Sequence, residues 1–80
     1  MIQIKTIQQL KEACMDESQD FFIQLNGGVR SSKTIEFHSD EEIFEVFNFI
    51  DDSEQELTEQ ELFTESNIGK AITKGTLYLT

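Results

Sequence analysis

The alternation of apolar and polar residues constrains this chain most, because it predicts neighbouring antiparallel strands. Residues 20–25 place Phe21, Ile23 and Leu25 on one face of an extended segment. Residues 32–38 alternate in the same way. The Asn and Gly residues between the two segments tolerate the backbone angles of a hairpin connection, so we expect the segments to pair.

Residues 39–50 allow two interpretations. Ser39 and Glu42 could form a helical capping box, and the apolar residues after them have helical spacing. Residues 43–50, however, hold six apolar residues in eight, all β-branched or aromatic, which is typical of a strand. We favour the strand, with residues 39–42 as a hairpin loop, because it completes a three-stranded antiparallel meander.

Capping signals predict helices near both ends of the chain. Thr6 and Gln9 can form a capping box for a first helix that ends near Cys14. Thr58 and Glu61 form a second capping box, which begins a short helix, and another short helix follows it.

These elements predict a single α+β domain over residues 1–80. It contains an N-terminal helix, a three-stranded antiparallel sheet, two short C-terminal helices and, at residues 76–79, at most a short edge strand. A chain of this length buries only about 60–65% of its unfolded surface, so the core is thin. The seven Phe residues supply much of its bulk.

The charge distribution bears most on function. Sixteen Asp and Glu residues oppose six Lys and Arg residues, which gives a formal net charge of −10. No Lys or Arg occurs between Thr34 and Gly69, and this stretch holds twelve of the acids, leaving four acids and six bases in the rest. So acidic a chain disfavours direct binding to DNA, RNA or an anionic membrane, because like charges repel.

The sequence also indicates a cellular compartment. A single Cys forbids an intrachain disulfide, the N-terminal residues do not form a signal peptide, and no apolar run approaches the ~20 residues that span a membrane. We expect an intracellular protein.

Metal-binding motifs are incomplete. The segments that begin at Asp16 and Asp51 resemble the start of an EF-hand loop, but Phe21 and Glu56 occupy the position where the loop needs Gly. One His and one Cys, far apart in sequence, do not make a zinc set. We therefore expect no metal and no cofactor.

Candidate nucleophiles and bases are scarce. Cys14 lies on the apolar face of the first helix, which favours a buried structural thiol over a catalytic one. His38 lies on the outward face of its strand among acids, which favour its protonated form, and no nucleophile or orienting partner is evident. We expect no catalytic residue and no enzymatic activity.

Residues 27–33 form the one basic, hydroxyl-rich segment. Its backbone N–H groups, with Arg30 or Lys33, could cradle a phosphate, although the order of residues is not that of a P-loop. A plain hairpin connection is the favoured interpretation. Arg30 and Lys33 could also pair with the acidic face, where exposed ion pairs are worth only ~0–1 kcal/mol.

The acidic stretch has two interpretations. It could be a solvated face that only confers solubility. Alternatively, its carboxylates could stand in for phosphates while neighbouring aromatic residues give apolar anchors, so that the protein competes with nucleic acid for a basic groove on another protein. The candidate partner-binding residues are Glu41, Glu42, Glu45, Asp51, Asp52, Glu54 and Glu56.

Three segments carry a resemblance to known proteins. Phe22–Lys33, Phe49–Thr58 and Asn67–Ile72 are similar to segments of small acidic proteins encoded by phages and prophages, and the likeness covers most of residues 20–78. In size and acidity the chain also resembles anti-CRISPR proteins, many of which block the nucleic-acid groove of an effector. The resemblance brings no catalytic residues, and it implies the cytoplasm of a host bacterial cell.

We therefore expect a non-enzymatic, phage-type inhibitor that acts as a DNA mimic. Its acidic face would bind a basic nucleic-acid-binding surface of a host protein such as a CRISPR effector. The alternative is a homodimeric structural or regulatory phage accessory protein without mimicry. An enzyme or phosphate-binding module that uses Arg30 to Lys33 is the third hypothesis.

Overall fold

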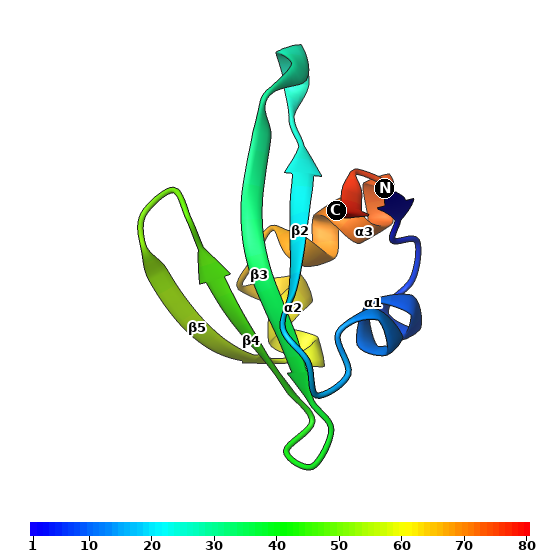
Figure 1. Cartoon of the computed structure of the whole chain (residues 1–80), viewed down its shortest axis with the longest axis vertical. Helices are drawn as coiled ribbons and strands as arrows, with labels where there is room; N and C mark the ends of the chain where they lie inside the picture. Colours follow the sequence, from blue (N-terminus) through cyan, green and yellow to red (C-terminus); the bar gives the residue numbers. More distant parts are fainter.

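Strands make up more of the chain than the sequence predicts. The computed structural model describes residues 1–80 and shows six strands, three α-helices and one 3₁₀ turn (Figure 1). In chain order they are β1 (Ile2–Gln3), α1 (Ile7–Ala13), β2 (Gln19–Gln24), η1 (Asn26–Gly28), β3 (Arg30–His38), β4 (Ile43–Asn48), β5 (Ser53–Thr58), α2 (Glu59–Thr64), α3 (Ile68–Lys74) and β6 (Leu77–Leu79).

All six strands form one antiparallel sheet in the order β1-β6-β2-β3-β4-β5. The predicted three-stranded sheet is therefore wrong, although its three strands correspond to β2, β3 and β4 at the centre. The strand interpretation of residues 43–50 is confirmed over Ile43–Asn48, and residues 39–42 form the predicted hairpin loop.

The sequence does not predict the strand β5, because five of its six residues are polar. It pairs along its whole length with β4, and Leu57 is its one buried residue. The preceding turn is held by Asp51, whose carboxylate accepts hydrogen bonds from the backbone N–H and the hydroxyl of Ser53. Pairing to a neighbouring strand, rather than an apolar pattern, makes this segment a strand.

The two chain ends meet in the sheet. The segment predicted as an edge strand, β6, lies between β1 and β2, because the N-terminal residues add a further strand outside it. Ile4 N–H donates to the Leu77 carbonyl at 2.8 Å, and both side chains are buried. Burial of these two residues fixes the ends of the chain to the core.

Thr6 and Thr58 are confirmed as the N-cap residues of α1 and α2, but only the second forms a full capping box. Thr58 and Glu61 form the reciprocal capping box of α2. Thr6 accepts a hydrogen bond from Gln9 N–H, but the Gln9 side chain accepts from Lys5 N–H instead of from Thr6. Gly75 ends α3 with φ of 73°, a left-handed conformation that favours Gly.

The three helices pack against one face of the sheet, here called the inner face (Figure 1). Leu10 and Cys14 from the α1 region, Leu62 from α2 and Ile68 and Ile72 from α3 join one core with the inward side chains of the strands. None of the helices is long and apolar enough to cross a membrane.

The opposite face of the sheet, here called the outer face, has no covering layer (Figure 1). Phe22 is buried on it outside the main core, stacked on Tyr78 with 5.3 Å between ring centroids. The Arg30 guanidinium lies 4.3 Å from the centroid of the same ring. One aromatic residue of the outer face is thus shielded by its neighbours on the strands rather than by a helix.

Candidate functional site

A row of three glutamates crosses the outer face. Glu36 on β3 pairs in register with Glu45 on β4, and Glu45 pairs with Glu56 on β5. Their side chains point to the outer face because residues 35, 46 and 57 beside them point inward. Like charges directly opposite one another destabilise a sheet, so this row opposes folding rather than assisting it.

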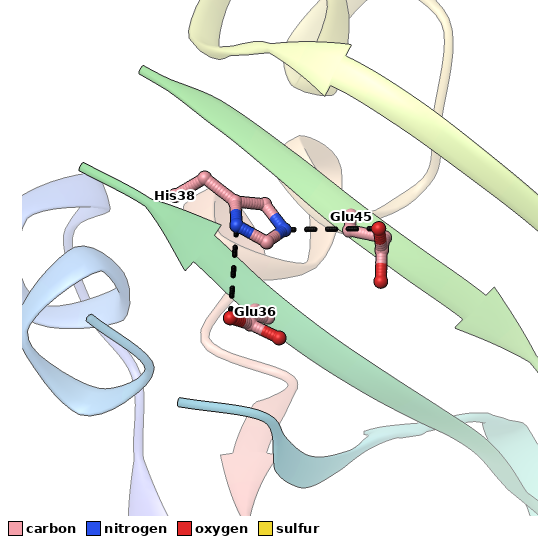
Figure 2. Close-up of side chains that lie close together, drawn as sticks. All are labelled: Glu36, His38 and Glu45. Carbon is pink, nitrogen blue, oxygen red and sulfur yellow. Dashed lines mark ion pairs between the residues drawn. The ribbon is translucent and has the colours of Figure 1, made fainter. Parts of the chain in front are cut away.

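His38 lies between two of these carboxylates (Figure 2). Its Nδ1 is 3.6 Å from Glu36 Oε2, and its Nε2 is 3.7 Å from Glu45 Oε2. The two contacts are ion pairs when the ring is protonated. The imidazole then offsets part of the repulsion between the two carboxylates.

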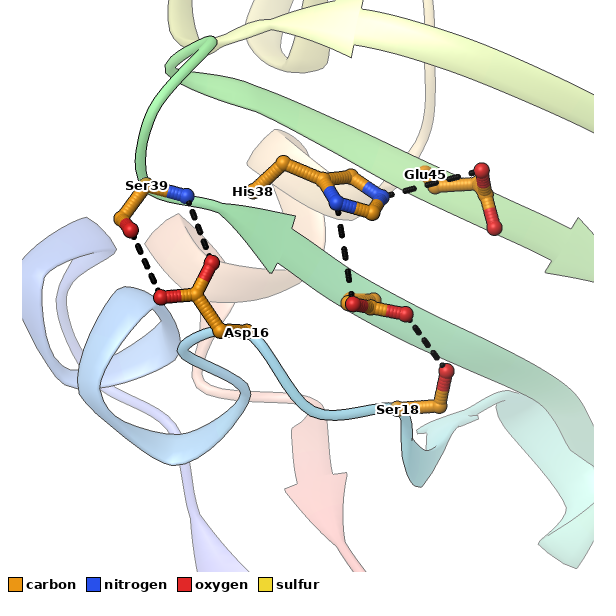
Figure 3. A network of polar contacts seen from close by, with 6 residues as sticks. Asp16, Ser18, His38, Ser39 and Glu45 are labelled. Atoms are coloured by element: carbon orange, nitrogen blue, oxygen red, sulfur yellow. Dashed lines mark hydrogen bonds and ion pairs between the residues drawn. The ribbon is translucent and has the colours of Figure 1, made fainter.

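Serine hydroxyls donate hydrogen bonds to two acids near His38, Glu36 and Asp16 (Figure 3). Ser18 donates to Glu36 Oε1 at 2.9 Å. The Asp16 carboxylate accepts from the backbone N–H of Ser39 at 3.0 Å and from its hydroxyl at 2.6 Å. These two bonds lower the pKa of Asp16 and attach the segment before β2 to the turn between β3 and β4.

The same cluster offers a set of metal ligands. One ligand atom each from Glu36, His38 and Glu45 lies within 4.8 Å of the other two. An imidazole with two carboxylates is a donor set that suits Zn²⁺ or Mn²⁺. The sequence does not reveal this set, because only strand pairing brings Glu45 on β4 beside His38 on β3.

The seven acids that the sequence selected do not share one surface. Glu45, Glu54 and Glu56 lie on the outer face. Glu41 and Glu42 lie in the turn between β3 and β4, while Asp51 and Asp52 lie in the turn at the other end of β4. Six residues of strand, about 20 Å, separate the two turns.

Two further acids belong to the outer face. Glu36 completes the glutamate row, and Asp20 on β2 pairs in register with Thr34, from which it accepts a hydrogen bond. The alternation of residues 32–38 already placed Glu36 outward, and this was the signal that could have identified it. The outer-face acids are hereafter Asp20, Glu36, Glu45, Glu54 and Glu56.

Exposed apolar side chains adjoin these acids. Phe47 lies on the outer face between Thr34 and Glu54 in register. Its ring meets that of Phe49 edge to face, with centroids 5.1 Å apart, and Phe49 is 54% exposed. An open apolar side chain beside carboxylates is typical of an interaction surface.

The basic segment has a different structure from the predicted one. Arg30 to Lys33 belong to β3 rather than to a loop, and no ion pair joins Arg30 or Lys33 to the acidic face. Lys33 points to the inner face, where it is buried and donates to the Asn48 side chain. Burial lowers the pKa of its ammonium group.

The prediction of a buried thiol is confirmed. Cys14 is fully buried, and its thiol donates to the Leu10 carbonyl at 3.1 Å. Burial raises the pKa of the thiol to about 12, so the reactive thiolate is not formed at neutral pH.

Comparisons with known proteins do not assign a class to this site. No protein-family profile matches the chain, and neither a curated protein nor a solved structure shows significant similarity to it.

Proposed function

We propose that this chain is a non-enzymatic inhibitor that binds a basic, nucleic-acid-binding surface of a host protein, such as a CRISPR effector. The outer-face acids stand in for phosphates, and Phe47 and Phe49 supply apolar contacts. A phage-type origin is part of this proposal and rests on the sequence resemblance.

The observation that carries the proposal is the glutamate row across β3, β4 and β5. Three carboxylates in register oppose the stability of the sheet, yet they occupy the one face that no helix covers. A basic partner would remove this repulsion on binding. If this face conferred only solubility, a mixture of positive and negative side chains would do so equally well.

Backbone spacing supports the comparison with phosphates. Neighbouring strands lie about 4.8 Å apart, so carboxylates on adjacent strands are separated by a distance comparable with that between successive phosphates of a nucleic-acid strand. The row Glu36–Glu45–Glu56 therefore presents closely spaced negative charges along one line.

The test compares two triple variants of equal charge. Replacement of Glu36, Glu45 and Glu56 by Gln removes the row, while replacement of the exposed Glu12, Glu17 and Glu65 by Gln removes three charges elsewhere. Pull-downs from bacterial lysate, with mass spectrometry, identify proteins retained by the wild type at low salt. We expect the row variant to lose a nucleic-acid-binding protein that the control variant retains.

Competition then tests mimicry itself. Added DNA or RNA should displace the wild-type protein from its partner, and the affinity should fall as salt rises. Equal retention by both triple variants, or a partner that binds this protein and nucleic acid together, would refute the proposal.

A second candidate is a homodimeric structural or regulatory accessory protein. The observation in its favour is that β5 is an edge strand of the sheet, so that one side of it pairs with no other strand. Pairing of two β5 edges would, however, bring Glu54 and Glu56 of both copies together. Light scattering distinguishes the candidates, since a stable dimer at micromolar concentration supports this second one.

A further inference from the structure

The inner face of the sheet contains a polar pocket away from the outer-face acids. It lies between the ends of β3, β4 and β5 and the residues that precede α3, and its volume is about 380 Å³. This volume is within the range of sites for small molecules. Eight of its eleven lining residues are polar or charged, which is unusual for the helix-covered side of a sheet.

Lys33 supplies the cation of the pocket. The residue is only 5% exposed, and its ammonium group donates to Asn48 Oδ1. An ammonium group carries three donors, and no second acceptor in the chain binds it, so two donors remain for a ligand. An ammonium group with free donors at a pocket can bind an anionic group through charge-assisted hydrogen bonds.

Ser31 contributes a hydroxyl to the same pocket. It lines the same pocket, it points to the inner face two residues before Lys33, and it is only 4% exposed. Its hydroxyl forms no hydrogen bond within the chain, and since no buried side-chain polar atom lacks a partner, this oxygen is open to the pocket. The hydroxyl and the ammonium group are therefore both available to one bound group.

Asp51 supplies an anion at the same pocket. The Ser53 backbone N–H and hydroxyl hold its carboxylate, and these bonds lower the pKa of Asp51. Asp51 and Lys33 both line the pocket but do not form a direct ion pair. The pocket thus presents one positive and one negative group that remain apart.

We propose that this pocket binds a small zwitterion of the α-amino acid class. The ligand carboxylate accepts from the Lys33 ammonium and the Ser31 hydroxyl, and its amino group donates to Asp51. The side-chain amides of Gln55 and Asn67 are placed to contact the rest of the ligand.

The charge of the whole chain favours a zwitterion over a simple anion. At a net charge of −10, the protein repels free anions, and Asp51 repels them locally. A zwitterion has no net charge and makes favourable contacts with both fixed groups. The two ends of an amino acid also match a pocket whose opposite charges are not in contact.

Calorimetric titration of the full chain tests this inference with L-serine and L-glutamine as probes. Acetate and methylammonium, each carrying one half of the zwitterion, are the comparison ligands. We expect saturable binding of at least one amino acid and at least tenfold weaker binding of both half-ligands.

Two variants locate the site, with Lys5→Met as the matched control because Lys5 is exposed and outside every pocket. Lys33→Met and Ser31→Ala should each weaken amino-acid binding at least tenfold, while Lys5→Met should leave it unchanged. Ser31→Ala removes no internal hydrogen bond, so it keeps the test valid if Lys33→Met fails to fold. Absence of saturable binding, binding unaffected by Ser31→Ala, or acetate binding as tight as that of an amino acid would overturn the inference.

This test is separate from that of the proposed inhibitor function. The glutamate-row variant should bind the amino acid normally, because Glu36, Glu45 and Glu56 do not line the pocket. Loss of partner binding with normal amino-acid binding would therefore identify the outer face alone as the inhibitory surface.

Discussion

Arg30 and Lys33 lie three residues apart on β3 and point to opposite faces of the sheet. Arg30 covers the Phe22 ring on the outer face, and Lys33 is buried in the inner pocket. In the sequence both cations belong to one basic segment, residues 27–33, that begins with two glycines typical of a turn. Because side chains alternate along a strand, the inclusion of Arg30 and Lys33 in β3 places one cation on each face of the sheet.

Asp16 should contribute to stability in a pH-dependent way. Its hydrogen bonds from Ser39 favour the ionised form, so its pKa in the folded state lies below the ordinary value of 3.8. The stability that it contributes is present above the unfolded pKa and is lost as pH falls through the folded pKa. We expect Asp16→Asn to destabilise the protein at neutral pH and to cost less at about pH 2.5.

Urea denaturation at the two pH values measures this difference. Asp40→Asn is the control, since Asp40 is exposed in the turn after β3 and forms no side-chain hydrogen bond. An equal loss of stability for Asp16→Asn at both pH values would show that the Ser39 bonds do not depend on the carboxylate charge.

At the scale of elements, the sequence predicts a helix or strand correctly where the residues that stabilise it lie close together in the sequence. The Thr58–Glu61 box needs only residues three apart, and the sequence predicts it correctly. The sequence does not predict β5, because its stabilising contacts come from β4 and five of its six residues are polar. A strand at a sheet edge can be polar on nearly all sides, so periodicity does not reveal it.

Loss of the capping box should destabilise α2 measurably. Thr58 joins the end of β5 to the start of α2 and accepts the hydrogen bond from Glu61 N–H. We expect Thr58→Ala to lower the free energy of unfolding by about 1 kcal/mol.

Chemical denaturation followed by circular dichroism measures the effect of Thr58→Ala. Thr64→Ala, at the exposed end of the same helix, is the matched control and should change stability by less than about 0.5 kcal/mol. Equal effects of the two variants would mean that the cap contributes nothing specific.

At the scale of the whole molecule, the two faces of the sheet differ in what they carry, because the helices pack against only one of them. The inner face holds the core and the polar pocket. The outer face holds the glutamate row with His38 between two of its members. The strands β1 and β6, from the two ends of the described chain, both belong to this sheet.

Relief of repulsion in the glutamate row should stabilise the fold. Glu56 faces Glu45 in register and forms no ion pair. We expect Glu56→Gln to raise the free energy of unfolding by about 0.2–1 kcal/mol at low ionic strength. The gain should shrink at high salt, where the repulsion is screened.

Thermal or urea unfolding at low and high salt measures this gain. Glu17→Gln, which removes the same charge from an exposed position outside the row and outside the helices, is the control. A destabilised Glu56→Gln variant would contradict the view that the row opposes folding and would weaken the argument for its function.

The sequence alone determined the elements whose causes are local. It predicted the strands that became β2, β3 and β4, the caps of α1 and α2, the buried thiol of Cys14 and the outward position of His38. Alternation and capping act over two to four residues, so the printed order of residues contains the whole signal.

Only the tertiary structure decided the number of strands and the composition of both candidate sites. Register between β3, β4 and β5 aligns three glutamates that lie nine and eleven residues apart, and it separates them from the acids in the two turns. The same pairing places Lys33, Asn48 and Ser53 together on the inner face. Cross-strand pairing depends on contacts between distant residues, and such contacts have no local signature in a single sequence.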